Sequence, residues 1–562
     1  EAALVQTAGI PGYPCYRTVE ETFTTGASIA ANYPELATWT DQGDSWEKTN
    51  GSGGYDLYVL KLTNSAVPGP KPKLFLTGAI HAREYTTAEL LTRLAEYLVD
   101  NYNTDPDVTW MLDYHEIHMM LHANPDGRKQ AETGLLWRKN TNQDYCGPNS
   151  NYRGADLNRN FEFKWNCFGG SSGDPCSLVY RGPYAASEPE TQAIQNYIRS
   201  QFPDQRGPNN SDPAPLDTTG IYLDIHSHGR EILYQPRWLN ESKEPVPNVT
   251  ELITLARKIA YFNGYRVYGS TPDGTSKLFG YGEMGIPAYT VELGTAFFES
   301  CSYFENTLLA DNIPALFYAL KVARTPYMTS AGPDAVNPGL SAGSTSPGIS
   351  AGTSVTLTAS VDDTRCNNNT GSEPWQNIAA AQYYVDVPPW VSAQGPVAYD
   401  MWPVDGNFNS GVEAAEATIN TTGWKEGRHI IFVRGQDTDG NWGAFSAVFL
   451  YINNSVGNLP AGPTNLTAKA ISNRINLAWT DNSDNEEGFR IYRGDTPLTL
   501  IPITSVQPNT TYYQDSDLTP KTVYFYKVCA YNVYGEGCST TVQYRQKQNR
   551  EKGNWWKENG AR

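Results

Sequence analysis

The chain has 562 residues, a formal net charge of −18 and a sequence pI of about 4.9, with 39% hydrophobic and 12% aromatic residues. This length exceeds what one hydrophobic core serves, so about two to four domains are expected. The acidic balance leaves no dominant basic face and excludes nucleic acid as a partner. No apolar run reaches the roughly 18 residues of a membrane span.

The N-terminus and the cysteines indicate an exported protein. The sequence lacks both an initiator methionine and a visible signal peptide, as expected of a secreted chain whose signal has been removed. Its eight cysteines show no zinc-ribbon spacing, so we expect disulfides. Cys529 and Cys538 form a plausible local pair, and Cys146 is expected to join Cys167 or Cys176.

Residues 1–328 alternate between strand and helix signals. Apolar, strand-like runs occur at 73–80, 116–121, 220–227 and 287–294, and helical patterns occur at 86–102 and 188–202. Alternating units of this kind predict an α/β domain with a largely parallel or mixed sheet flanked by helices.

The composition changes after residue 328. A linker rich in Gly, Ser and Pro at 329–353 precedes strand-like runs at 354–361, 380–387, 429–437 and 447–452, which predict an Ig-like β-sandwich domain over 329–456. Two all-β sandwich domains are therefore expected, the second over 457–545.

That second segment resembles a fibronectin type III domain. In the resemblance, which covers residues 460–545, Trp479 is the core tryptophan and Tyr524 the corner tyrosine. The tail at 546–562 is expected to be disordered.

A histidine and a glutamate stand at the seam between the run at 73–80 and the helix that follows. They are His81 and Glu84, and His226 follows another strand-like run. In α/β sheets, functional groups gather beyond the carboxyl ends of strands. Two imidazoles and one carboxylate, with a position left for water, are the ligand pattern of catalytic zinc. Taken alone, however, His-x-x-Glu also fits a strand-end histidine bonded to a neighbouring carboxylate.

Four other histidines are interpreted as structural. His115, His118 and His122 lie in or beside the strand-like run YHEIHMMLH without an acidic ligand pattern, and His429 lies in the predicted β-sandwich.

Further polar residues favour the functional interpretation of His81. Glu292 lies near the end of the apolar run PAYTVEL, where a lone carboxylate needs a partner. Arg138 stands in LLWRKN, and Asn158 and Arg159 stand between Leu and Phe in DLNRNF. An arginine with an asparagine in that setting suits the bidentate capture of a carboxylate.

The motifs HARE, NPDG, WRKN, DLNRNF, IHSHG and VELG occur in the order seen in zinc metallocarboxypeptidases. Over roughly residues 10–325 the chain resembles the carboxypeptidase A, B and T group, and in particular its secreted bacterial members. The resemblance implies an α/β fold with a central mixed sheet and one zinc ion. It matches His81, Glu84 and His226 to the zinc ligands.

The resemblance also assigns roles around the metal. It matches Asp156 to a carboxylate that orients His81. Arg138 matches the arginine that polarises the scissile carbonyl, and Glu292 the general base. Asn158 and Arg159 match the anchors for the free C-terminal carboxylate of the substrate, which would make the enzyme an exopeptidase.

Three more residues are matched to substrate contacts. Arg83 would touch the substrate backbone, and Tyr268 is the candidate for a mobile tyrosine that closes over the substrate. Lys277 falls where one residue helps to select the C-terminal side chain, and an ammonium there would favour Glu or Asp. Alternatively, Lys277 points to solvent and Leu278 and Phe279 line the pocket; of the two, we expect this neutral or apolar preference.

The predicted function is that of a secreted zinc metallocarboxypeptidase that acts on peptide or protein C-termini. One alternative is a zinc amidase that acts on cell-wall peptides and need not keep Asn158 and Arg159. Another is a binding or adhesion protein with a vestigial peptidase domain, which should have lost Glu292 or a metal ligand. The β-sandwich modules would bind an unknown surface or polymer, or act as spacers. The segment DTDGNWG at 437–443 is a possible structural Ca²⁺ site, although a hairpin turn is the preferred interpretation.

Overall fold

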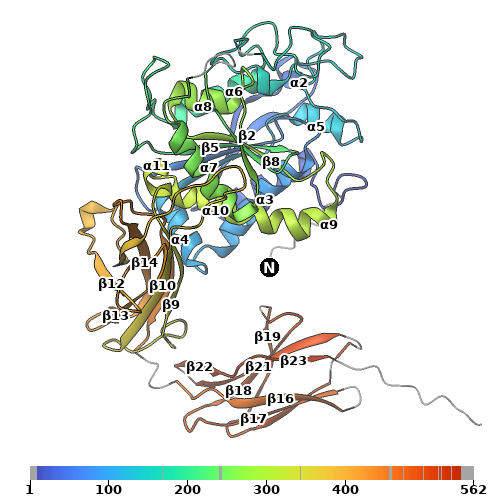
Figure 1. The fold of residues 1–562 in the computed structure, drawn as a ribbon. Coiled ribbons are helices and arrows are strands. Elements are labelled where there is room, and N and C mark those ends of the chain that lie inside the picture. Colours follow the sequence, from blue (N-terminus) through green and yellow to red (C-terminus); the bar gives the residue numbers. More distant parts are fainter. Residues whose placement is uncertain are drawn as a thin grey trace, which may run out of the picture. The chain divides into compact units, whose positions relative to one another are not determined.

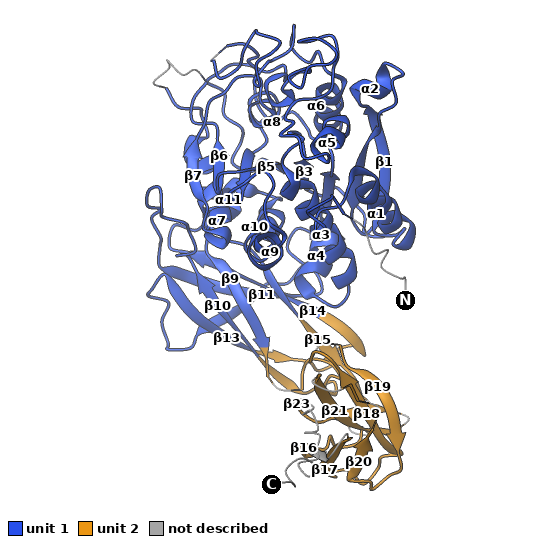
Figure 2. Cartoon of the chain, turned by 90° about the vertical axis from the view of Figure 1, so that its right-hand side faces the viewer, with its two compact units in different colours: residues 1–339, 357–417, 430–448 blue, residues 340–356, 418–429, 449–562 orange. Residues whose placement is uncertain are grey.

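The computed structural model describes residues 9–545 apart from 168, 239–243, 342, 455–458, 472–473, 498, 517, 520–521 and 533. The predicted disordered tail at 546–562 lies outside the described residues. The chain divides into two compact units (Figure 2). The first comprises residues 1–339, 357–417 and 430–448, and the second comprises 340–356, 418–429 and 449–562.

An eight-stranded mixed sheet forms the centre of the first unit. Its strands are β1 (Ala37–Asp44), β2 (Asp56–Leu62), β3 (Lys73–Gly78), β4 (Glu116–Met120), β5 (Ile221–Ser227), β6 (Glu231–Tyr234), β7 (Arg266–Gly269) and β8 (Ala288–Leu293). They are arranged in the order β1-β2-β4-β3-β5-β8-β6-β7. The pairs β3–β4, β3–β5 and β5–β8 are parallel, whereas β1–β2, β2–β4 and β6–β8 are antiparallel. The expected α/β fold with a mixed sheet is confirmed.

Helices cover both faces of this sheet. They are α1 (Val19–Asn32), α2 (Trp46–Thr49), α3 (Tyr85–Asn101), α4 (Pro106–Tyr114), α5 (Pro125–Ala131), α6 (Pro189–Gln201), α7 (Val249–Asn263), α8 (Ser276–Met284), α9 (Cys301–Tyr303), α10 (Leu309–Val322) and α11 (Pro326–Ser330). Figure 1 shows α3, α7 and α10 on one side of the central strands, with α6 and α8 on the other. Strand β5 is buried along its whole length, as expected of a central strand covered on both faces.

An antiparallel sheet of seven strands follows. Its strands are β9 (Asp334–Leu340), β10 (Ser354–Asp362), β11 (Ile378–Val385), β12 (Tyr399–Pro403), β13 (Val412–Asn420), β14 (Gly427–Asp437) and β15 (Ser446–Ile452), in the order β15-β14-β11-β12-β13-β10-β9. Burial alternates along β13, the mark of a strand with one face to a core and one to solvent. The segment expected to be a linker contains β9 and the end of α11, so part of it is regular structure rather than a spacer.

The last segment forms two smaller antiparallel sheets. The first has the order β16-β17-β20, and the second has β19-β18-β21-β22 with β23 also on β21. The strands are β16 (Thr464–Ile471), β17 (Arg474–Thr480), β18 (Gly488–Gly494), β19 (Ile501–Val506), β20 (Tyr512–Asp515), β21 (Val523–Asn532), β22 (Gly535–Cys538) and β23 (Val542–Arg545). Trp479 is buried against Phe489, and the hydroxyl of Tyr524 accepts from the Thr519 N–H at 2.9 Å.

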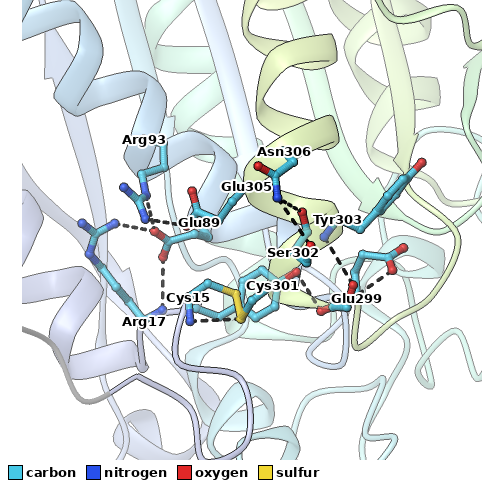
Figure 3. Close-up of a disulfide and its surroundings, with 12 residues drawn as sticks. Cys15, Arg17, Glu89, Arg93, Glu299, Cys301, Ser302, Tyr303, Glu305 and Asn306 are labelled. Atoms are coloured by element: carbon cyan, nitrogen blue, oxygen red, sulfur yellow. Dashed lines mark hydrogen bonds and ion pairs between the residues drawn. A yellow bond between two sulfur atoms is a disulfide. The ribbon is translucent and has the colours of Figure 1, made fainter. Parts of the chain in front are cut away.

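Three disulfides join described residues. Cys529–Cys538 and Cys146–Cys176 fall within the pairings predicted, and Cys167 is left free. The third, Cys15–Cys301, links the N-terminal segment to α9 across 286 residues of sequence, and Figure 3 shows it beside a set of ion pairs.

Among the described residues, no helix is both long enough and apolar enough to cross a membrane.

Candidate metal centre and active site

Three side chains meet where β3, α3 and β5 come together. His81 follows β3, Glu84 is the N-cap residue of α3, and His226 is the last but one residue of β5. Because β3 and β5 are parallel neighbours, their carboxyl ends reach the same edge of the sheet. The sequence places a histidine at each end and starts a helix beside them, which brings the three residues together.

Their ligand atoms converge. Nδ1 of His81 lies 2.8 Å from Oε1 of Glu84, and Nδ1 of His226 lies 3.0 Å from Oε2 of Glu84 and 3.0 Å from Nδ1 of His81. All three residues are buried, and one ligand atom from each lies within 4.8 Å of the others. Burial disfavours the charge of Glu84, but the two imidazoles hold its pKa below the ordinary range. The donor set of two imidazoles and one carboxylate fits a catalytic zinc ion.

Asp156 lies behind His81. Its Oδ1 is 3.1 Å from Nε2 of His81, and its Oδ2 accepts from Nε and Nη2 of Arg138 at 3.0 and 2.9 Å. Full burial disfavours a charged Asp156, yet Arg138 and His81 hold its pKa well below the ordinary value. A carboxylate on the far nitrogen directs Nδ1 of the ring toward a metal.

Asp224 holds His226 in the same way, although it was not among the residues predicted from sequence. Its Oδ2 lies 2.8 Å from Nε2 of His226, and its Oδ1 accepts from Thr77 Oγ1 at 2.7 Å. Ser276 Oγ and Asn158 Nδ2 also donate to Oδ2. The available signal was spacing, because residues two apart on a strand share a face and Asp224 stands two before His226.

A cavity of about 280 Å³ opens beside the triad. It is lined by His81, Glu84, Arg138, Asn158, Arg159, His226, Ser227, His228, Leu233, Ser270, Pro272, Thr275, Lys277, Thr290, Glu292 and Phe297. Most of the site residues predicted from sequence therefore line one cavity.

Glu292 reaches this cavity from β8. It stands directly opposite His226 in the parallel β5–β8 pair, so the sheet register fixes its place beside the triad. Burial raises the pKa of Glu292 to about 7, close to the value that suits a proton acceptor at neutral pH.

Asn158 and Arg159 lie on a short 3-10 helix at Leu157–Arg159. Nδ2 of Asn158 is 3.0 Å from Nε2 of His226, and its Oδ1 accepts from the Ser276 N–H at 2.9 Å. Arg159 donates to the carbonyls of Gly170 and Asn158, at 2.8 and 2.6 Å. The asparagine amide therefore already contacts the metal-ligand network, while the guanidinium is held at the cavity wall by backbone oxygens.

Lys277 lies on α8 and is only 1% exposed. Its Nζ donates to Ser270 O at 2.6 Å and to Gln235 Oε1 at 3.1 Å. Burial and the neighbouring Arg159 lower the pKa of Lys277 to about 7. The ammonium therefore lines the cavity and does not point to solvent, whereas Leu278 and Phe279 are buried away from the lining.

Two residues matched by resemblance do not line the cavity. Tyr268 lies on β7 and is 60% exposed, so the structure does not bring it to the site. Arg83 also lies outside the lining, but its guanidinium stacks 3.8 Å from the ring centroid of Phe297, which is part of the wall. His228 also packs against the Phe297 ring, with centroids 4.6 Å apart, and was not assigned a role from sequence.

The structure gives no support to the possible calcium site at 437–443. Both carboxylate oxygens of Asp437 accept from Asn441, one from its backbone N–H and one from its side chain. Within the described residues, the other group with metal-binding composition consists of Cys529, Glu536 and Cys538, and its cysteines form a disulfide.

Comparisons with known proteins agree with this geometry. The family model described as zinc carboxypeptidase matches residues 25–308. Mouse carboxypeptidase A4 is 29% identical over 261 residues, which cover 46% of this chain and 54% of that protein. A protein named zinc carboxypeptidase from Saccharothrix mutabilis subsp. capreolus is 29% identical over 293 residues, covering 50% of this chain and 62% of that protein. The chain thus spans about half the length of the curated relatives it matches.

A solved structure of thrombin activatable fibrinolysis inhibitor aligns with 55% of this chain and 74% of that chain, at 23% identity and a TM-score of 0.47. The family match alone spans about half of the chain and contains the whole triad of His81, Glu84 and His226. The chain therefore belongs to the zinc carboxypeptidase family.

Proposed function

We propose that the protein is a secreted zinc metallocarboxypeptidase that hydrolyses the C-terminal peptide bond of peptides and proteins. The observation that carries the proposal is the convergence, in one cavity, of three metal donors with Glu292, Arg138 and Arg159. His81, Glu84 and His226 would hold the zinc ion. When bound, zinc acts as a Lewis acid and makes a bound water more acidic.

The chain's own residues supply the remaining chemistry. Glu292 would take a proton from the attacking water and deliver it to the leaving amine. Arg138, held by Asp156, would donate to the oxygen of the scissile carbonyl as charge develops there, and one such donor typically contributes about 10²–10³ in rate. Arg159, with Asn158, would bind the substrate's terminal carboxylate and so restrict cleavage to the last bond.

The experiment that tests this proposal is the release of C-terminal amino acids from a panel of peptides, with and without a zinc chelator. We expect release from free-acid peptides that stops when zinc is removed. Matched amidated peptides should be cleaved poorly, because the partly buried guanidinium of Arg159 would be left without a carboxylate partner. Such a loss typically costs about 2–5 kcal/mol of binding free energy. Equal cleavage of free-acid and amidated peptides would favour the zinc amidase, and no cleavage by the zinc-loaded protein would favour a vestigial binding protein.

We further propose that the pocket prefers substrates that end in Glu or Asp. Lys277 supports this preference because its ammonium lines the cavity and is held by a carbonyl and an amide oxygen. A substrate carboxylate would add the missing counter-charge, while a basic side chain would be repelled.

The test compares kcat/KM for matched peptides ending in Glu, Leu and Lys in the wild type and in Lys277→Met. We expect Glu to lead in the wild type and Leu to lead in the variant. A wild-type preference for Leu that the substitution leaves unchanged would refute the acidic preference without touching the peptidase activity itself.

The export and the module assignments are supported by separate features. Three disulfides fit an oxidising compartment. The buried Trp479 and the Tyr524 hydroxyl that accepts from the Thr519 N–H support a fibronectin type III domain over residues 457–545. The Ig-like sandwich domain over 329–456 rests on the antiparallel strands of that segment. We infer that these modules act as spacers or bind an extracellular surface or polymer.

A further inference from the structure

The first unit contains a second and larger cavity, of about 600 Å³, that shares no lining residue with the catalytic one. It lies where the peptidase region meets the seven-stranded sheet. Trp110 of α4, Tyr327 of α11, and Trp390, Trp442 and Phe445 from the β region contribute its aromatic walls. Its volume lies in the range of sites for small organic molecules.

Two guanidinium groups line this cavity without a carboxylate partner among the described residues. Arg324 donates from Nη2 to the Tyr114 carbonyl at 3.0 Å. Arg434 donates from Nη2 to Tyr384 Oη at 2.6 Å and to Gln382 Oε1 at 3.2 Å. The Nε atom of each arginine is buried and makes no hydrogen bond within the described part of the chain.

The arginines are partly compensated by aromatic rings. The guanidinium of Arg324 lies 4.9 Å from the Trp390 ring centroid, and that of Arg434 lies 3.9 Å from that of Trp442. Stacking of this kind stabilises the charge but leaves N–H donors unused. The indole Nε1 of Trp390 is also buried without a described acceptor.

The other titratable groups of the cavity lining do not neutralise the charges of Arg324 and Arg434. Lys321 forms an ion pair with Asp107 at 2.5 Å, so its charge is already matched. His115 is buried, and burial, together with Arg324, holds its pKa well below the ordinary value, so the ring is neutral. Glu251 is the one carboxylate in the lining, and the described residues record no ion pair between it and either arginine. The cavity therefore carries an excess of positive charge.

Solvent can reach this site. Met328 and Leu216 belong to the lining and are 50% and 56% exposed. Guanidinium groups bind carboxylates through paired N–H donors, and tryptophan faces bind apolar or aromatic bodies. We propose that this cavity binds a small organic carboxylate whose charge pairs with Arg324 and Arg434 and whose aromatic or apolar body lies against the tryptophans.

The test is calorimetric titration of the full-length chain with phenylacetate, its neutral analogue phenylacetamide and inorganic phosphate. The chain carries Arg159→Gln, so that the catalytic cavity does not capture the probe. We expect one equivalent of phenylacetate to bind. Phenylacetamide and phosphate should bind at least about tenfold more weakly, because the amide lacks the negative charge and phosphate lacks the aromatic ring.

Two variants and a matched control locate the site. Arg434→Gln and Arg324→Gln, each in the Arg159→Gln background, should weaken phenylacetate binding about tenfold or more. Arg474→Gln removes an exposed arginine of the last module and should leave it unchanged. In the chain that keeps Arg324 and Arg434, phenylacetate should also raise Tm, and phenylacetamide should not. This comparison remains valid even if the cavity variants fail to fold. Equal binding of acid and amide, phosphate binding as tight as phenylacetate, or unchanged affinity in both cavity variants would each overturn the proposal.

Discussion

At the scale of single residues, the geometry of the candidate metal centre depends on two buried carboxylates as well as on the three ligands. Asp156 and Asp224 each bind the far nitrogen of one histidine, so both rings present Nδ1 to the same point. Each carboxylate is itself held, Asp156 by Arg138 and Asp224 by Thr77 and Ser276. The ring orientations are therefore set by buried networks.

Asp224→Asn should weaken zinc binding about 10- to 100-fold while the fold persists, because the amide cannot support the His226 ring as the carboxylate does. Competition with a chromophoric chelator measures the affinity without relying on turnover. Asp217→Asn, which changes an exposed aspartate in the same way, is the matched control and should bind zinc as the wild type does. Equal zinc affinity in both variants would show that Asp224 does not position His226.

Glu292→Gln should keep the zinc content and the fold but lower kcat by about 10²–10⁴, since glutamine has the shape of glutamate and cannot accept the proton. Zinc analysis and circular dichroism establish that the variant is loaded and folded before kcat is measured. A loaded variant with nearly normal kcat would remove Glu292 from the role of general base.

The preference for acidic substrates should depend on pH. The pKa of Lys277 is lowered to about 7 by burial and by Arg159, so the ammonium is present below that pH and is lost as pH rises through it. The ratio of kcat/KM for Glu-ending to Leu-ending peptides should therefore fall between about pH 6 and 8. Lys277→Met should show a flat ratio, and a flat ratio in the wild type would contradict the recognition role of Lys277.

At the scale of elements, the sequence located the sheet and helices that carry the site. The strand expected at 73–80 is β3 at Lys73–Gly78, and the helix expected at 86–102 is α3 at Tyr85–Asn101. Long periodic or wholly apolar segments determine their own structure, so they are predictable. His81 and Glu84 follow from the same local pattern.

Other features depend on contacts that no local pattern encodes. Strand β9 is rich in turn residues and forms because β10 is beside it in the sheet. The support of His226 by Asp224 requires Thr77 from β3 and Ser276 from α8. Tyr268 was placed by alignment in a segment that turns out to be strand β7, which directs it to solvent.

The N-terminal segment that contains Cys15 and Arg17 is attached to the first unit by both a disulfide and ion pairs. Cys15 is bonded to Cys301, while the neighbouring Arg17 pairs with Glu89 at 2.7 Å (Figure 3). Arg17 also pairs with Glu96 at 2.6 Å. The ion pairs and the disulfide attach the same segment to α3 and α9. The covalent link and the ion pairs therefore hold the same segment by two independent kinds of contact.

Cys15→Ala/Cys301→Ala should lower the free energy of unfolding by about 2–5 kcal/mol, because the link closes a very long loop in the unfolded chain. Thermal unfolding should show a lower Tm, while kcat stays near the wild-type value because neither cysteine lines the catalytic cavity. The exposed, unpaired Cys167 provides a control, since Cys167→Ala removes no link. An unchanged Tm in the double variant would mean that the ion pairs of Arg17 are enough to hold the N-terminal segment in place.

At the scale of the whole molecule, residues 357–417 and 430–448 of the seven-stranded sheet region belong to the same compact unit as residues 1–339. Phe432 and Tyr384 belong to the same buried core cluster as Trp110 of α4. The Trp110 ring lies 5.7 Å from that of Trp390 and 6.4 Å from that of Phe432, centroid to centroid. The peptidase region thus shares its core with the segment that follows it in sequence.

Polar contacts join the same two regions. Arg257 of α7 pairs with Glu373 at 2.7 Å, and Asn367 Nδ2 donates to the carbonyls of Ala260 and Tyr265, each at 3.0 Å. The Tyr265 carbonyl directly precedes β7, whose end leads to Ser270 at the catalytic cavity. The β region therefore contacts the segment that leads to Ser270 of the cavity lining, in addition to sharing the core.

A chain that ends at Ser330 should consequently fold poorly, whereas one that ends at Asn454 should keep the peptidase. The shorter chain exposes the apolar surface around Trp110 and leaves buried groups such as Lys258, which pairs with Asp334 at 3.5 Å, without their partners. Uncovered apolar surface and unpaired buried charge both destabilise the folded state.

The expectation is checked on both shortened chains beside the full-length chain. The measurements are soluble yield, Tm and the zinc-dependent release of C-terminal amino acids. The 1–454 chain should match the full length in kcat/KM, because it retains every residue that lines the catalytic cavity and the β region that supports it. A stable, fully active 1–330 chain would show that the shared core is dispensable and that the peptidase region folds alone.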